Sequence, residues 1–261
     1  IFVYPLHMGM AGAAIASVIG SGTTIVILLS HFFSKANGLH FHFEGISFQH
    51  MKEIYATGFT SFLVDVNAGI VTAVFNLTLL KYIGDVGVSM YGVICNTAII
   101  VTCLCNGINQ AVQPIVSTNY GAGRSDRITT VRKTGIKAGV AICAAPAIIG
   151  LIIPNLFTYI FLNPNQEILA LSPMAIRIYF TGFFVTGINM FIVGYFQSTV
   201  KPHISLLLCM LRGCVLSILF VIILPHFLDV SGIWAAVPLG EFVTLFIALY
   251  FLKKQSKEVH A

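Results

Sequence analysis

The stretch GINQAVQPIVSTNYGAGR, residues 107–124, places two asparagines and two glutamines in otherwise apolar surroundings. It begins as the polar face of an apolar helix and then passes Pro114, a residue type that disrupts helices because it lacks an N–H donor. It ends in a glycine-rich turn, and a basic segment, residues 124–137, follows at once. A soluble protein would rarely bury so many amides in so apolar a helix. Polar groups inside membrane helices instead face the bundle interior or a water-filled cavity, so this stretch predicts a membrane helix beside a polar interior.

The composition of the chain places it in a lipid bilayer. Hydrophobic residues make up 57% of the 261 residues and charged residues 9%, and the mean hydropathy is +0.92, whereas soluble domains carry about 25% charged residues. Seven apolar stretches exceed the roughly 20 residues that a membrane-spanning helix needs: 8–33, 54–80, 86–117, 133–161, 168–198, 203–227 and 231–252. Strands of a transmembrane barrel would be about half as long and would alternate in polarity. We therefore predict an all-α, polytopic integral membrane protein built as a helical bundle.

Positive charges between the stretches predict the orientation of the chain. Eleven of the 14 lysines and arginines fall on one side of the membrane, namely Lys35, Lys52, Arg124, Arg127, Arg132, Lys133, Lys137, Lys201, Lys253, Lys254 and Lys257. The opposite side carries only Lys81. Because cytoplasmic loops are enriched in lysine and arginine, we expect a multi-pass protein of the plasma (inner) membrane with a cytoplasmic C-terminus. Nucleic-acid binding by the basic cluster is disfavoured, since the cluster is a short loop held between two spans.

The sequence lacks the motifs that several classes of protein need for their activity. The sequence has no Gly-rich phosphate loop ending in Lys-Ser/Thr, no Gly-x-Ser-x-Gly and no His-Glu-x-x-His, so we expect neither an ATP-driven pump nor a hydrolase. The six cysteines lie in apolar stretches without a Cys-x-x-Cys pair, which favours reduced packing residues. His40, His42 and His50 in the first cytoplasmic connection are more typical of solvated loop residues than of a metal site. We expect no enzyme, no resident metal and no cofactor, apart from a coupling ion, Na⁺ or H⁺.

A weak internal repeat predicts the domain organisation. A shift of 220 residues superposes two ridges of small residues, pairing Gly12 with Gly232, Ala16 with Ala236, Gly20 with Gly240 and Thr24 with Thr244. Such ridges let membrane helices approach closely, and coincidence between two Ala/Gly-rich helices is the alternative to duplication. Under duplication, residues 1–53 are the last helix of an N-terminal six-helix lobe and a cytoplasmic linker, 54–252 are a complete C-terminal six-helix lobe, and 253–261 are a cytoplasmic tail. Because the chain begins at Ile1 without an initiator Met, we expect about five more helices upstream.

Polar side chains align along one face of each of two neighbouring spans. At 100° per residue, the aligned positions are Gly58, Ser61, Asp65, Gly69, Thr72 and Asn76 in the second stretch, and Asn96, Cys103, Asn106, Gln110, Gln113 and Ser117 in the third. A hydrogen-bonded helix interface without a cavity is one explanation, and a water-filled path for substrate or ions is the other. We predict the path, with a helix bend at Pro114 and a lining of Ser61, Thr72, Asn76, Asn96, Asn106, Gln110, Gln113, Arg177 and Tyr195.

Two carboxylates inside apolar stretches are candidates for ion coupling. Asp65 lies in the polar face of the second stretch, and Glu241 lies near the middle of the last. A carboxylate at this depth is costly unless it is paired, protonated or hydrated, which suits a group that binds and releases a proton or another cation. The alternative for Asp65 is a static ion pair with Arg177 or Arg212, and Glu241 could equally serve in charge pairing.

An ordered set of short segments resembles the multidrug and toxic compound extrusion (MATE) family. Residues 9–16, 58–76, 107–123, 177–179, 211–213 and 232–241 are similar to parts of its sixth, seventh, eighth, tenth, eleventh and twelfth helices. The resemblance implies two six-helix bundles that rock about a central site, and an antiporter that exports amphipathic, often cationic, compounds against inward Na⁺ or H⁺ flow. The span 168–198 departs from the pattern, because some members place a second cation-binding carboxylate there and this chain has none. The coupling ion is therefore left open.

Two other functions are alternatives for a membrane bundle of this composition. A lipid-linked precursor flippase of a related bundle type would need a groove rich in arginine, and only Arg177 and Arg212 are available inside the spans. A non-transporting membrane scaffold would not need aligned polar faces. The expected partners are thus the lipid bilayer, small organic substrates and a missing N-terminal lobe of the same chain, with no nucleic acid.

Overall fold

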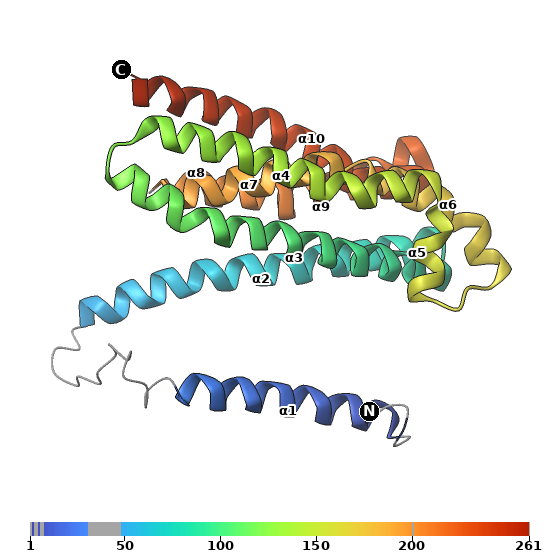
Figure 1. Cartoon of the computed structure of the whole chain (residues 1–261). Helices are drawn as coiled ribbons and strands as arrows, with labels where there is room; N and C mark the ends of the chain where they lie inside the picture. Colours follow the sequence, from blue (N-terminus) through green and yellow to red (C-terminus); the bar gives the residue numbers. More distant parts are fainter. Residues whose placement is uncertain (1, 3–4, 6–7, 31–47, 200, 261) are drawn as a thin grey trace. The chain divides into compact units, whose positions relative to one another are not determined.

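The computed structural model describes the chain except for residues 1, 3–4, 6–7, 31–47, 200 and 261, and leaves out the side chains of 48–50, 52–65, 202 and 256–260 (Figure 1). The chain divides into two compact units, Ile1–Thr57 and Gly58–Ala261. Most of the predicted first connection, with His40 and His42, lies outside the described residues, and its last residues, from Phe48 on, are helical. The predicted lobe boundary at residue 54 stays a prediction.

The described part of the first unit includes the apolar helix α1 (Gly9–Ser30), which is long enough to cross a membrane. Its hydroxyl groups bond within the helix, since Thr23 Oγ1 donates to Ile19 O at 2.8 Å and Thr24 Oγ1 donates to Gly20 O at 3.0 Å. Polar side chains satisfied in this way are compatible with a lipid-facing surface. Helix α2 (Phe48–Tyr82) begins in this unit and continues into the second.

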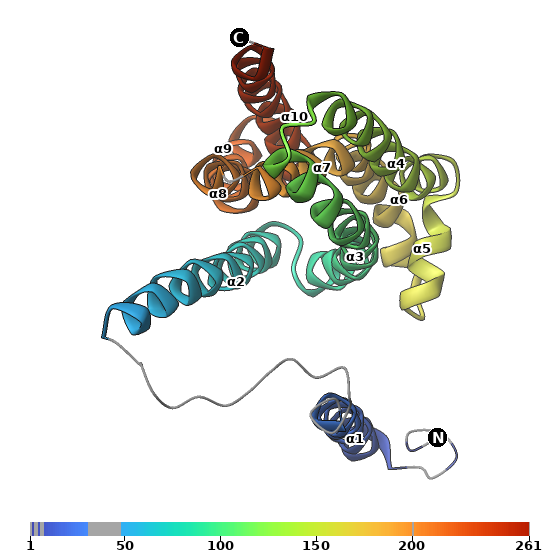
Figure 2. The same ribbon diagram turned by 60° about the vertical axis from the view of Figure 1, so that its left-hand side comes forward.

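The described part of the second unit is helical apart from short connections (Figures 1 and 2). After α2 follow α3 (Asp85–Gly121), α4 (Ser125–Ile152), α5 (Pro154–Phe161), α6 (Gln166–Phe180), α7 (Phe183–Ser198), α8 (Pro202–Met210), the π-helical segment η2 (Leu211–Val215), α9 (Leu216–Ile223) and α10 (Pro225–His260). Helices α6 and α7 together make one long span, and α8, η2 and α9 make another. The predicted all-α membrane fold is confirmed, with six described helical segments long and apolar enough to cross a bilayer.

Both predicted ends of the fourth stretch differ from the ends of helix α4. The prediction followed where the sequence is apolar, and a helix can extend into polar residues or end within an apolar stretch. Helix α4 begins at Ser125, ahead of the predicted start at residue 133, since the basic residues of its first turns are helical although they are not apolar. It ends at Ile152, and Pro154 starts the separate helix α5, where a missing N–H costs nothing. Helix α3 runs through Pro114 to Gly121, so this proline does not end the helix, and the functional bend stays a prediction.

Helices α4 and α7 cross at glycines. A Cβ atom on Gly139 would lie 2.9 Å from the carbonyl oxygen of Gly187, and one on Gly187 would lie 2.7 Å from the carbonyl carbon of Gly139. Phe191 of α7 covers Gly135 in the same way, one turn along α4. Small residues spaced by four therefore let the two backbones touch, which fixes the position of α7 beside α3 and α4 (Figure 2).

The small-residue ridge predicted on the last span packs inside the second unit. Gly232, Ala236, Gly240 and Thr244 are all buried in α10, and Gly240 faces Leu216 at the start of α9. Trp234, which is 1% exposed, anchors the same helix in the main apolar core. Because this packing fixes the rotation of α10 about its axis, it also decides where Glu241 points.

Candidate functional site

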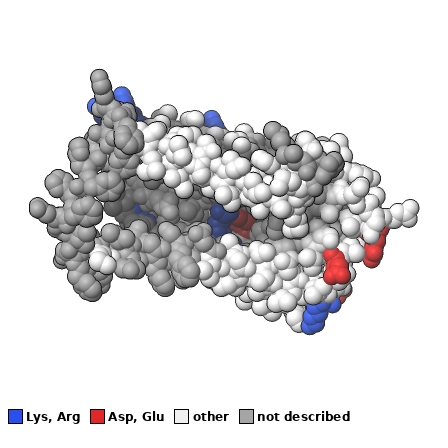
Figure 3. All heavy atoms as spheres, turned by 90° about the horizontal axis from the view of Figure 1, so that it is seen from below, with Lys and Arg blue, Asp and Glu red and all other residues white. Residues whose placement is uncertain are grey.

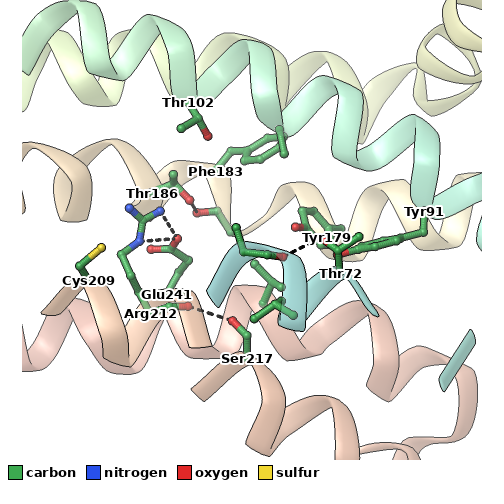
Figure 4. A pocket seen from close by; sticks show the side chains of 16 residues that line it. Thr72, Tyr91, Thr102, Tyr179, Phe183, Thr186, Cys209, Arg212, Ser217 and Glu241 are labelled. Atoms are coloured by element: carbon green, nitrogen blue, oxygen red, sulfur yellow. Dashed lines mark hydrogen bonds and ion pairs between the residues drawn. The ribbon is translucent and has the colours of Figure 1, made fainter. Parts of the chain in front are cut away.

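A cavity of about 310 Å³ lies inside the second unit, where helices from both ends of its sequence meet (Figure 4). Its wall includes ten labelled side chains, which are Thr72, Tyr91, Thr102, Tyr179, Phe183, Thr186, Cys209, Arg212, Ser217 and Glu241. Three of them are aromatic, four are serine or threonine, and two are charged. Ligand pockets are typically concave, mostly apolar, and contain a few convergent polar groups. The cavity has this character at the low end of the usual size range, about 300–1,000 Å³.

The charged residues of the wall form an ion pair. Arg212 donates to the same carboxylate oxygen of Glu241 from two nitrogens, from Nη2 at 2.7 Å and from Nε at 3.1 Å. Figure 4 shows the two side chains pointing toward one another, with Thr186 beside them. The Arg212 side chain is 18% exposed and that of Glu241 is 5% exposed. Charges this far from bulk water are tolerated only when they are paired and hydrogen-bonded.

Asn189 of α7 completes the environment of the carboxylate. Its amide Nδ2 donates to the second carboxylate oxygen of Glu241 at 2.7 Å and to the Glu241 backbone carbonyl at 2.8 Å. Asn189 is fully buried, and its Oδ1 has no hydrogen-bond partner among the described residues. One amide thus fixes both the side chain and the main chain of Glu241, and it does so independently of Arg212.

Arg212 lies in a segment with an unusual helical geometry. Residues Leu211–Val215 form a π-helix between α8 and α9, and Ser217 Oγ donates to the Arg212 carbonyl at 2.9 Å. Single π turns inside longer helices are uncommon and occur frequently at functional sites. Arg212 of this segment lies on the cavity wall.

The structure brings some of the predicted site residues together. Thr72 and Glu241 line the cavity, as do Tyr91 and Tyr179, two tyrosines of predicted spans. The side chains of Asp65 and Ser61 lie outside the described residues. Arg212, considered above as a partner for Asp65, pairs with Glu241. Sequence reasoning missed Asn189, because a lone amide in an apolar helix gives no indication of what it faces.

The polar face predicted on α3 does not line this cavity. Asn96, Asn106, Gln110 and Gln113 are exposed on the second unit, because α3 packs against α4 and α7 through an opposite, apolar face. Val93, Ile94, Val101 and Cys105 form that buried face. The predicted periodicity is thus present, but the face is open within the described part of the chain.

Three further predicted lining residues lie elsewhere. Arg177 is exposed on α6, and its Nε donates to the Leu151 carbonyl at the end of α4, at 3.1 Å. Tyr195 is buried in a small apolar cluster with Phe191, and Asn76 is half-buried on α2. In the view of Figure 3 an adjoining basic and acidic group lies near the middle of the described surface, and most of the other charged groups lie toward its ends.

A model of the MatE family matches residues 61–223, which is more than half of the chain. The chain belongs to the MatE family. The match includes α3, α4, α6, α7 and the π-helical segment with Arg212, and it ends before α10 and Glu241. Multidrug proteins of this family transport compounds and are not enzymes. The MatE chain described here is a multi-pass membrane protein.

Two relatives are similar to this MatE chain over most of its length. The multidrug export protein MepA of Staphylococcus haemolyticus (strain JCSC1435) is 22% identical over 258 residues, which are 97% of this chain and 55% of that protein. The protein of the same name from Staphylococcus saprophyticus subsp. saprophyticus is 22% identical over 224 residues, covering 85% of this chain and 49% of the relative. The chain thus spans about half the length of these curated relatives.

Solved structures show the same fold at low sequence identity. An outward-facing multidrug resistance MATE family transporter of the MOP superfamily aligns with a TM-score of 0.84 and 20% identity, over 100% of this chain and 59% of that one. A MOP superfamily transporter from Pyrococcus furiosus, reported with a binding pocket of reversed polarity, aligns with a TM-score of 0.86, also at 20% identity and with 59% of its chain covered. The resemblance found in the sequence is therefore confirmed at the level of family and fold.

Proposed function

We propose that the chain is the C-terminal portion of a cation-coupled antiporter that exports amphipathic, often cationic, organic compounds by alternating access. The observation that carries this proposal is the buried carboxylate of Glu241 on the wall of an aromatic cavity, balanced by a cation of the same chain. Carboxylates inside membrane proteins frequently mark ion and substrate pathways. Membership of a family of multidrug transporters supports the same function.

The open polar face of α3 supports a second lobe in the working protein. Asn106, Gln110 and Gln113 are exposed on the described unit, and lipid would leave their amides without hydrogen-bond partners. A water-filled cleft between this unit and an N-terminal lobe would hydrate them. The relatives, about half of whose length this chain spans, have room for such a lobe. In this arrangement the α3 face lines the substrate path.

The proposed coupling residues are Asp65 and Glu241, with Na⁺ or H⁺ as the coupling ion. Binding of the ion at either carboxylate would neutralise it and weaken its attraction for a cationic compound. Release of the compound on one side of the membrane would thus be tied to uptake of the ion there. The positive charges that surround the α3–α4 connection favour the plasma (inner) membrane with a cytoplasmic C-terminus.

The experiment that tests this proposal is gradient-driven efflux of a fluorescent lipophilic cation by the complete reading frame in membrane vesicles. A Na⁺ gradient and a pH gradient are imposed separately, and Asp65→Asn is compared with the unmodified protein. Efflux under one gradient names the coupling ion. An Asp65→Asn protein with unchanged transport and pH dependence would remove Asp65 from the mechanism.

A lipid-linked precursor flippase is the alternative that this experiment also addresses. Such a ligand is anionic and needs uncompensated arginines, whereas the one arginine on the described cavity wall is neutralised by Glu241. No efflux under either gradient would move the proposal to a flippase, and after that to a non-transporting scaffold.

A further inference from the structure

The two partners of the cavity ion pair are held very differently. Glu241 is 5% exposed, and Asn189 fixes both its second carboxylate oxygen and its backbone carbonyl. Arg212 is 18% exposed, and it donates two N–H bonds to one oxygen of Glu241. The carboxylate is therefore built into the wall, while the guanidinium is attached to it from the cavity side.

The geometry of the pair is typical of a contact that can be exchanged. A guanidinium binds a carboxylate most strongly through two parallel bonds to two oxygens. Here both N–H groups share Oε1, and Asn189 occupies Oε2. When Arg212 leaves, Oε1 loses its donors but Oε2 keeps its own, so the carboxylate stays in place and can accept another cation.

The backbone that carries Arg212 offers a way for it to move. Arg212 belongs to the π-helical segment Leu211–Val215, and the side chain of Ser217 donates to its carbonyl oxygen at 2.9 Å. Gly213, the residue that follows Arg212, has open space around its Cα, with nothing within 4 Å of a Cβ built there. A change from π to α register turns the side chain by about one residue step, roughly 100°, and needs no separation of packed helices at this glycine.

We propose that Arg212 is a tethered counter-cation, which occupies the carboxylate of Glu241 when no ligand is bound and is replaced there by a free monovalent cation. The proposal rests on the transport function proposed above and names the chemistry of its cavity. Because Arg212 and Glu241 sum to zero charge, a single positive charge is what the exchange requires. The carboxylate is then never left uncompensated in the low-dielectric interior, whichever partner it holds.

Two kinds of monovalent cation could take the place of Arg212. One is the inorganic coupling ion, and the other is an organic cation that also contacts the aromatic wall at Tyr91, Tyr179 and Phe183. Benzamidinium is a suitable organic probe, because benzamide has the same shape without the charge. NaCl is the inorganic probe.

The test measures how far each probe shifts the melting temperature of the purified full-length protein. It also determines the probe concentration at which half of that shift is reached. In Arg212→Gln the internal competitor is gone, so the concentration of benzamidinium or Na⁺ needed for half of the effect should fall about tenfold. This factor is expected if Arg212 holds the site for about nine-tenths of the time. Benzamide should have no effect. Arg212→Lys keeps the tethered charge and should respond like the unmodified protein.

Matched variants separate exchange from a purely structural ion pair. The double variant Arg212→Gln with Glu241→Gln removes both charges, and its melting temperature should no longer respond to either cation. The control is Arg127→Gln, which replaces an exposed arginine on α4 and should leave the response to both cations unchanged. A larger gain with benzamidinium than with Na⁺ assigns the exchange to the organic ligand, and the reverse assigns it to the coupling ion. If Arg212→Gln binds both cations no better than the unmodified protein, or unfolds irrespective of added cation, the tethered counter-cation is refuted. Efflux by the unmodified protein would in that case leave the transport function standing.

Discussion

The crossing of α4 and α7 yields the sharpest stability prediction, for Gly187→Ala. A Cβ atom at Gly187 would lie 2.7 Å from the carbonyl carbon of Gly139, whereas ordinary contacts begin at 3.4 Å. The carbonyl oxygen of Gly139 would lie closer still, so the two backbones must separate locally by at least about 0.7 Å. Overpacking of this kind costs about 1–3 kcal/mol, and we expect the upper end of the range because the clash is with main-chain atoms that cannot rotate away. A loss of about 3 kcal/mol lowers a melting temperature by roughly 6–12 °C in proteins of this size.

The assay for Gly187→Ala is thermal unfolding of the purified full-length protein in detergent. The control is Gly92→Ala on α3, since a Cβ at Gly92 would have nothing within 4 Å. That variant should melt at the same temperature as the unmodified protein or slightly higher, because alanine favours a helix over glycine. Equal melting temperatures for Gly187→Ala and Gly92→Ala would refute the close crossing of α4 and α7.

Three further outcomes follow from individual contacts. Asn189→Leu removes the amide that donates at 2.7 Å and 2.8 Å to Glu241. We expect the free energy of unfolding to fall by about 2–4 kcal/mol, which would appear as a lower melting temperature. An unchanged melting temperature would mean that Glu241 does not depend on this amide. Cys105 and Cys143 have sulfur atoms 3.2 Å apart, so copper-phenanthroline oxidation in vesicles should protect one pair of thiols from alkylation in the unmodified protein and none in Cys143→Ser. Arg177→Gln should leave binding of benzamidinium unchanged, since Arg177 is exposed and contacts Leu151 outside the cavity; weaker binding would return Arg177 to the site.

The membrane fold could be predicted because its signals are local. Long apolar stretches and the placement of lysine and arginine depend only on neighbours in the sequence, and the structure has helices at these places. The ends of α4 were less predictable, because residues 125–132 are polar and yet helical. Whether Pro114 ends a helix also cannot be decided locally, since α3 continues beyond it to Gly121.

The candidate site could be predicted only in part. Glu241 stands out in the sequence because it is a carboxylate in an apolar stretch, and the structure places it on the cavity wall. Its pairing with Arg212 depends on the rotation of two helices about their axes, which the burial of Gly240 and the π-helical segment fix and which no periodicity reveals. For α3, periodicity identified the polar face correctly, but it could not tell a face inside the bundle from the open face that Gln110 and Gln113 occupy.

The measurement that tests the account most directly is efflux of a fluorescent lipophilic cation by the complete reading frame, with Glu241→Gln beside the unmodified protein under the gradient that drives transport. Glutamine keeps the shape of the side chain and one acceptor oxygen, so the variant should remain folded, with a lower melting temperature because the charge of Arg212 loses its partner. The account predicts that Glu241→Gln loses gradient-driven efflux while it stays in the membrane at normal abundance. Efflux by folded Glu241→Gln at the rate of the unmodified protein would contradict the central claim that this carboxylate serves transport.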